Sequence, residues 1–209
     1  MKITKMIHAI ALLVATTLPL AAASITTTFA DNNRFTGNMF NLTTLGSSIT
    51  VNGLDVNVDS GAVTIDVYIK TGTYVGFDTN AAAWTLVSTT VVTGKGAGSQ
   101  TAVNVTPFTL AANTLYGVYV TTTNPNDSTP FMYYTNGSNT YSNSNLTLST
   151  GEGLGGLFGS ISVEPGRTWD GTIDYSLPTT TLPEPSSLGL LALGAPAFLL
   201  LRRRYFRKY

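Results

Sequence analysis

The stretch Val63-Thr64-Ile65-Asp66-Val67-Tyr68-Ile69-Lys70 decides the fold class of this chain. Its residues alternate strictly, so the four aliphatic side chains fall on one face and the Thr, Asp, Tyr and Lys side chains on the other. This two-residue period is the pattern of a half-buried antiparallel β-strand. We therefore expect a sheet with one face on a core and the other toward solvent.

The segments around this stretch carry the same signal. Runs rich in Val, Ile, Thr and aromatic residues predict strands, and clusters of Gly, Asn, Asp and Pro predict the turns between them. The expected strands cover 48–51, 56–58, 63–70, 84–92, 101–110, 115–122, 131–135, 145–148 and 168–176. Gly151 to Gly159 reads as a loop. The pattern predicts an all-β domain over residues 24–177, an antiparallel two-sheet sandwich with jelly-roll-like topology.

The first 23 residues have the features of a secretory signal peptide. Lys2 and Lys5 precede an apolar segment over 6–15, which we expect to be helical, and the small residues Ala21 and Ala23 stand at the cleavage positions. The Sec machinery and signal peptidase are therefore the expected partners of this segment.

We expect signal peptidase to cut after Ala23. Cleavage after Ala30 is a second interpretation of this segment, and an uncleaved membrane anchor is a third. Cleavage at either site removes His8, the only histidine of the chain.

The C-terminal residues contain three parts in a fixed order. Pro183-Glu184-Pro185 follows a linker over 178–182, an apolar run extends from Leu188 to Leu201, and Arg202-Arg203-Arg204 comes next. The prolines keep the tripeptide extended, the apolar run can form a lipid-buried helix, and the arginines favour the cytoplasmic side. The run has 14 residues, fewer than the roughly 20 of a full span. An ordinary transmembrane anchor is the alternative interpretation.

In these parts and their order, residues 183–209 resemble the PEP-CTERM sorting signal of Gram-negative bacteria. The resemblance implies recognition by an exosortase, a membrane cysteine protease-transpeptidase that cleaves near Pro183-Glu184-Pro185. It also implies a transient stay in the inner membrane, then transfer to the cell surface or to an exopolysaccharide or biofilm matrix. This chain departs from many such tails by continuing from Tyr205 to Tyr209 after the arginines.

The ectodomain resembles a recurring secreted domain of uncharacterised bacterial surface proteins. The resemblance implies no activity. It rests on Gly37-Asn38-Met39-Phe40, Tyr74-Val75-Gly76-Phe77, Ala83-Trp84-Thr85-Leu86, Tyr116-Gly117-Val118-Tyr119-Val120 and Tyr134-Thr135-Asn136-Gly137.

Charge and composition exclude several functions. The ectodomain has four basic against ten acidic residues, a net charge of −6, which opposes nucleic-acid binding. The chain has no cysteine. Once His8 is removed, Ser-His-Asp and Cys-His catalysis and histidine-ligated metals are excluded.

Carboxylates are the remaining chemical candidates. A glycoside-hydrolase pair would have to come from Glu152, Glu164, Asp170 and Asp174. We favour the interpretation that these carboxylates lie in turns or face solvent. The segments Glu164 to Arg167 and Asp170-Gly171 are expected to be turns. A structural calcium could use Asp55, Asp59, Asp78 and Asp127, but these acids are scattered, so we expect no cofactor.

Aromatic residues give the best indication of ligand binding. Exposed rings stack on sugar faces, and the candidates are Tyr68, Tyr74, Phe77, Tyr133 and Tyr134, with Tyr141 nearby in sequence. The favoured alternative is that these rings cap the core of the sandwich. We expect Trp84 and Trp169 to be buried.

The sequence therefore predicts a non-enzymatic exported protein of the cell surface or extracellular matrix, structural or adhesive, that an exosortase sorts. The alternative is a carbohydrate-binding module that retains exopolysaccharide. A hydrolase is the third and weakest hypothesis.

Overall fold

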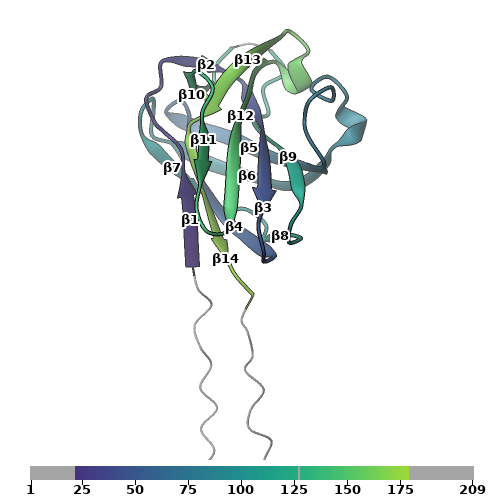
Figure 1. Ribbon diagram of the computed structural model, residues 1–209. Coiled ribbons are helices and arrows are strands. Elements are labelled where there is room, and N and C mark those ends of the chain that lie inside the picture. Colours follow the sequence, from purple (N-terminus) through teal and green to yellow (C-terminus); the bar gives the residue numbers. More distant parts are fainter. Residues whose placement is uncertain (1–21, 127, 179–209) are drawn as a thin grey trace, which may run out of the picture. The chain divides into compact units, whose positions relative to one another are not determined.

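The computed structural model describes residues 22–126 and 128–178. In these residues the regular structure is all β apart from two short 3-10 turns, η1 (Ala81–Ala83) and η2 (Leu157–Gly159). The strands form two antiparallel sheets (Figure 1), which confirms the predicted all-β class and the two antiparallel sheets. The expected signal-peptide helix and C-terminal transmembrane helix lie outside the described residues. Within the described part, no helix is long and apolar enough to cross a bilayer.

The smaller sheet, sheet A, has five strands among the described residues, in the order β1-β14-β4-β7, with β8 also on β4. Their bounds are β1 Ala22–Thr26, β4 Ile49–Asn57, β7 Gln100–Val103, β8 Phe108–Leu110 and β14 Gly171–Ser176. Ala22 of β1 pairs with Ser176 of β14. The described domain therefore begins and ends on one strand pair, as Figure 1 shows.

The larger sheet, sheet B, has nine described strands in the order β2-β10-β13-β12-β3-β9-β5-β6, with β11 on β12. Their bounds are β2 Asn33–Phe35, β3 Gly37–Thr44, β5 Gly61–Thr71, β6 Thr85–Gly94, β9 Leu115–Thr122, β10 Met132–Asn136, β11 Thr140–Ser142, β12 Leu146–Gly155 and β13 Ser162–Trp169. The alternating stretch is the middle of β5, where Ile65 lies opposite Thr122 of β9 and Thr90 of β6.

An inter-sheet core fills the space between the two sheets. Val63, Ile65 and Val67 of β5 meet Val51 and Val56 of β4, all with 2% exposure or less. Burying each such side chain stabilises the fold by about 1.5–3 kcal/mol. The predicted alternation therefore marks the core face of the larger sheet.

A second cluster, the outer aromatic cluster, lies on the opposite face of sheet B. Its buried members are Met39, Tyr74, Trp84, Tyr119 and Leu154, and Tyr68, Ala83, Phe158 and Val163 pack against them. The connections 72–84 and 156–161 supply Tyr74, Trp84 and Phe158. Sheet B is thus buried on both faces over part of its area.

Several predicted element bounds are corrected by the structure. The predicted strands 48–51 and 56–58 are one strand, β4, and the predicted strand 101–110 divides into β7 and β8. The predicted loop from Gly151 to Gly159 is wrong over its first half, because β12 continues to Gly155. The glycines there are needed for close packing rather than for a loop: a Cβ on Gly151 would lie 1.5 Å from the Met39 carbonyl oxygen.

The predicted strand 168–176 is two strands in different sheets. β13 ends at Trp169 in sheet B and β14 begins at Gly171 in sheet A. The Trp169 indole lies against Gly171, where a Cβ would come within 2.1 Å of the ring. The chain can therefore pass from sheet B to sheet A at Asp170 only because residue 171 is glycine.

Both sheets belong to one of the two units of the chain. The boundary between the units follows Pro178. Because the described core lies wholly before this boundary, we expect residues 24–178 to fold alone.

Candidate functional site

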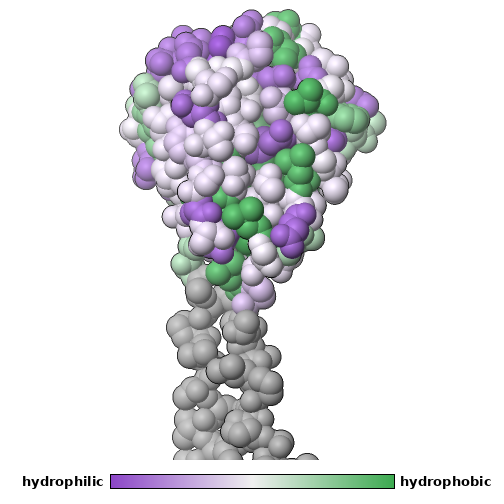
Figure 2. Space-filling view, viewed as in Figure 1, coloured by the Kyte–Doolittle hydropathy of each residue, from purple (hydrophilic) through white to green (hydrophobic). Residues whose placement is uncertain are grey.

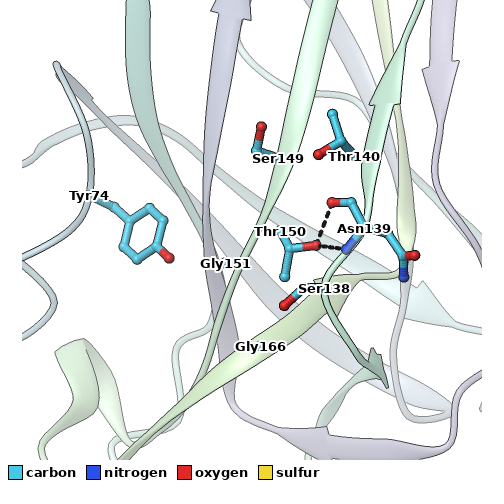
Figure 3. A pocket seen from close by; sticks show the side chains of 8 residues that line it. All are labelled: Tyr74, Ser138, Asn139, Thr140, Ser149, Thr150, Gly151 and Gly166. Atoms are coloured by element: carbon cyan, nitrogen blue, oxygen red, sulfur yellow. Dashed lines mark hydrogen bonds between the residues drawn. The ribbon is translucent and has the colours of Figure 1, made fainter.

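The candidate site is an open recess of about 310 Å³ on sheet B (Figure 3). Hydroxyl and amide side chains, two glycines and one tyrosine surround it. The lining residues are Tyr74, Ser138, Asn139, Thr140, Ser149, Thr150, Gly151 and Gly166. None of these lining side chains carries a formal charge at neutral pH.

A β-bulge in β12 shapes the floor of the recess. Ser149 pairs with Asn41 of β3 and Glu152 pairs with Met39, so two residues of β12 lie opposite Phe40 alone. Such an extra residue bends a strand and redirects its side chains. The bulge brings the Thr150 hydroxyl to the backbone N–H and carbonyl of Asn139 (Figure 3).

Hydrogen bonds fix the rim formed by the turn between β10 and β11. The Thr168 hydroxyl donates to the Gly137 carbonyl oxygen at 3.0 Å, and the Asn139 amide donates to the Thr168 hydroxyl at 3.3 Å. The Gly137 N–H donates to the Gly166 carbonyl oxygen. The connection 137–139 between β10 and β11 therefore holds one wall of the recess.

Tyr74 forms the opposite wall. Figure 3 shows its hydroxyl directed toward Thr150 and Gly151. Burial, followed by the charges of Glu152 and Asp78, raises the pKa of the Tyr74 phenol to about 12. The phenol is therefore a neutral hydrogen-bond donor at ordinary pH. Because Tyr74 is only 8% exposed, it can offer this hydroxyl but no open ring face.

The proposed stacking aromatics do not form a common surface. Tyr134 is fully buried, so its predicted role as a ligand-stacking ring is wrong. Tyr68 is half-buried, packs on Tyr119 and Phe158, and donates from its hydroxyl to Asp66 at 3.3 Å. The predicted burial of both tryptophans is confirmed, with Trp84 at 8% and Trp169 at 0% exposure.

The two remaining candidate rings lie at separate places. Phe77 is 37% exposed and is covered by the Lys70 ammonium group, 4.0 Å from the ring centre. Tyr133, near the β2 edge of sheet B, donates from its hydroxyl to Asp59 at 2.7 Å and accepts from Arg34 at 3.4 Å. Tyr141 packs against the inter-sheet core. These rings therefore provide no continuous platform for a sugar chain.

Of the four candidate catalytic carboxylates, Asp170 is the most strongly held. It is fully buried at the change of sheet and accepts from the Thr135 hydroxyl at 2.8 Å, the Asp31 N–H at 3.0 Å and the Asn57 amide at 3.4 Å. Burial outweighs these bonds and raises its pKa to about 6. Asp170 thus ties β10 of sheet B to β4 of sheet A.

The other three carboxylates have separate surroundings. Glu164, predicted to lie in a turn, is in β13 and forms an ion pair with Arg167 at 3.4 Å. Asp174 is exposed on β14, and its pKa is raised by burial and by Asp55. Glu152 follows the recess residue Gly151 in β12, and burial and then Asp78 raise its pKa. Among the described residues, one oxygen of Glu152 is buried without a hydrogen-bond partner.

The candidate calcium ligands do not converge either. Asp59 accepts hydrogen bonds from the Tyr133 hydroxyl and the Phe131 N–H, and Asp127 lies outside the described residues. The part of the chain that the structure describes contains no group of three or more acidic or histidine side chains placed to hold a metal ion.

Residues 183–185, 202–204 and Ala21, which carry the sorting and processing predictions, also lie outside the described residues. Sequence reasoning missed the hydroxyl-lined recess, because the bulge at Gly151 fell in a segment interpreted as a loop. The surface in Figure 2 is mostly weakly polar over the described residues, with apolar side chains scattered rather than gathered.

No protein-family model matches the chain, and no curated protein matches it. Among solved structures, one similar chain is that of the crystal structure of infectious bursal disease virus VP2 subviral particle. The identity is 13% over 88% of this chain and 46% of that chain, with a TM-score of 0.22. The chain therefore spans about half the length of that protein, and a similarity of this size supports no conclusion about fold or function.

Proposed function

We propose that this chain is an exported, non-enzymatic protein of the cell surface or extracellular matrix, structural or adhesive, that an exosortase sorts. The observation that carries the proposal is the order of Pro183-Glu184-Pro185, the apolar run 188–201 and Arg202-Arg203-Arg204 behind an N-terminal signal peptide. The expected partners are the Sec machinery, signal peptidase, the exosortase and the inner membrane, which the tail occupies only transiently.

The arrangement of the domain ends is consistent with processing at both termini. Cleavage after Ala23 would leave Ser24 to Thr26 paired with β14. Cleavage after Ala30 would remove Ile25, which is 5% exposed and belongs to the inter-sheet core. We therefore propose that signal peptidase cuts after Ala23.

The surroundings of the acidic residues support a non-enzymatic role. A glycosidase needs two carboxylates roughly 5–10 Å apart across a groove. Asp170 is fully buried, Glu164 is paired with Arg167, and Asp174 is on the other sheet from Glu152. None of the four candidate carboxylates is among the residues that line the recess.

Intact mass tests the proposal directly. We expect protein recovered from cells with the exosortase to begin at Ser24 and to end near Pro183, with any attached glycan or lipid as extra mass. Without the exosortase, the C-terminus should extend to Tyr209. A species ending at Tyr209 in both strains would contradict the sorting proposal.

The basic cluster provides a matched pair of variants. Replacing Arg202, Arg203 and Arg204 with Gln should leave the protein unprocessed and cell-associated, because the tail loses its cytoplasmic retention. Replacing Arg207 and Lys208 with Gln is the control, and normal release is expected. Unchanged release of the triple variant would overturn the role of the cluster.

A second candidate function is retention of exopolysaccharide, and the recess favours it. Its uncharged hydroxyl and amide lining suits a neutral polyhydroxylated ligand, which is bound through hydrogen bonds. We expect Thr140→Ala with Ser149→Ala to lower binding of the cells' own exopolysaccharide in a pull-down. Thr109→Ala on sheet A is the control. Equal binding by the recess variant and the control would exclude this site.

A further inference from the structure

One long edge of sheet B is unpaired in the described residues. β6 pairs with β5 on one side and forms the end of the sheet order, and β2 at the opposite end has three residues against ten in β6. The edge strand β1 of sheet A has five residues. An unpaired edge of this length is a template for an additional strand.

The direction of the backbone groups on β6 follows from its neighbours. The Thr123 N–H donates to the Thr64 carbonyl oxygen, so Thr64 faces β9. Backbone groups alternate along a strand, so Ile65 faces β6 and its partner Thr90 faces β5. Thr89 and Val91 therefore present their N–H and C=O groups to the free edge. No backbone hydrogen bond to these groups is found among the described residues.

The features that usually protect an edge strand are missing from β6. Natural edges carry Lys, Pro or bulges that prevent pairing, whereas β6 reads Thr-Leu-Val-Ser-Thr-Thr-Val-Val-Thr-Gly. Its one register shift lies near its start, opposite Val67 and Tyr68, and leaves residues 88–94 regular. Val91 is 70% exposed, more than any other large apolar residue among those described.

The nearby segment 104–106 does not cover this edge. The Thr106 N–H donates to the Ser88 hydroxyl, and the Thr90 hydroxyl donates to the Asn104 carbonyl oxygen, both at 3.0 Å. These contacts use side chains on the core face of β6. The outward backbone of Thr89 and Val91 is left available.

We propose that β6 pairs antiparallel with β6 of a second copy of this chain across a two-fold axis, with Val91 opposite Val91. A two-fold pairing brings each strand against its own sequence, and like charges opposite each other destabilise a sheet. β6 has no charged residue, so self-pairing meets no such repulsion. The register also places Thr89 opposite Thr93 and forms about six hydrogen bonds, two for each of three residue pairs.

A proline substitution tests whether the N–H of Val91 at the free edge of β6 is needed for dimerisation. Val91→Pro removes an N–H that faces the free edge and leaves the bonds to β5 in place. In sedimentation of residues 24–178 we expect wild type and Val91→Thr to dimerise and Val91→Pro to stay monomeric with an unchanged circular dichroism spectrum. A monomeric wild type at every concentration, or a dimeric proline variant, would overturn the proposal.

If Val91→Pro fails to fold, Val91→Lys makes the same test, because two lysines would face each other across the axis. We expect the dimer dissociation constant to rise about fivefold for a like-charge contact of this kind. An unchanged dissociation constant would exclude β6 as the interface.

A single cysteine tests the register, since the chain contains none. Hydrogen-bonded antiparallel partners have Cα atoms about 5.5 Å apart, within the range that a disulfide spans. We expect Val91→Cys to form a linked dimer under mild oxidation at least about tenfold faster than Ile161→Cys, because pairing raises the effective concentration of the thiols. Ile161 is comparably exposed, at 55%, and lies outside the strands. Equal rates would contradict the register.

Discussion

The two faces of sheet B show two ways of building a core. On the inner face, Val118 and Val120 of β9 join the inter-sheet core, which is mostly aliphatic and to which both sheets contribute. On the outer face, Tyr119 between them is equally buried, beneath Trp84 and Phe158 from two connections. The inner core is built mainly by strands, with Val58 and Val105 as its members from connections. The outer aromatic cluster, in contrast, exists only if its loops close over the sheet. We therefore expect the inner core to control global stability and the outer cluster to control local opening.

Trp169→Ala should lower the stability of the domain more than any other substitution proposed here. The Trp169 ring stacks on Phe40 at 4.9 Å and is fully buried in the inter-sheet core. Its truncation leaves a cavity between the sheets, so we expect a loss of about 4 kcal/mol in the free energy of unfolding. Urea denaturation followed by circular dichroism measures it. A loss below that of Trp84→Ala would reverse the ranking of the two clusters.

Trp84→Ala should lower the free energy of unfolding by about 2–3 kcal/mol. The structural change should be confined to the outer aromatic cluster. The Trp84 indole N–H donates to the Phe77 carbonyl oxygen at 2.9 Å, and the ring packs on Tyr119 at 6.1 Å between ring centres. Without it we expect faster amide hydrogen exchange in 72–84 and 156–161, with exchange in β4 and β5 unchanged. Uniformly faster exchange would mean that the outer cluster is part of the global folding unit.

The effect of pH on stability should come in part from Asp170, at the end of the inter-sheet core. Its pKa is about 6 in the folded protein against 3.8 ordinarily, so between these values the folded state binds more protons than the unfolded state. The free energy of unfolding should therefore rise as pH falls from about 7 to about 4, by about 2 kcal/mol for this group. Glu152 and Asp174 shift in the same direction.

Asp170→Asn isolates this contribution, and chemical denaturation at several pH values measures it. In Asp170→Asn, the free energy of unfolding should rise much less as pH falls. Asp174→Asn, at an exposed position, should keep most of the rise in the free energy of unfolding. An Asp170→Asn protein that keeps the full rise would assign the pH dependence to other carboxylates.

The sequence predicted the inner face of sheet B well because alternation marks a strand with one buried face. β5 and β9 were placed within two residues at each end. β3 was missed because Met39 and Phe40 are buried on opposite faces, which removes the alternation. The jelly-roll connectivity stays a prediction.

The candidate site was less predictable than the fold. Aromatic residues in loops were expected to face a ligand, yet the outer cluster buries Tyr74 and Trp84. The recess depends on Thr150 and Gly151, whose bulge results from register between three strands. Such long-range register leaves no local pattern in the sequence.

The pairing of β1 with β14 has a mechanical consequence. β14 lies between β1 and β4, with hydrogen bonds across both of its sides, and these bonds run perpendicular to the strands. A tensile load applied at the C-terminal end of β14, along its axis, is shared by all of these bonds at once. A load that pulls Ser24 of β1 away from Asp174 of β14 breaks the bonds to β1 one after another. The domain therefore resists a load directed along β14 far better than a load that pulls β1 and β14 apart.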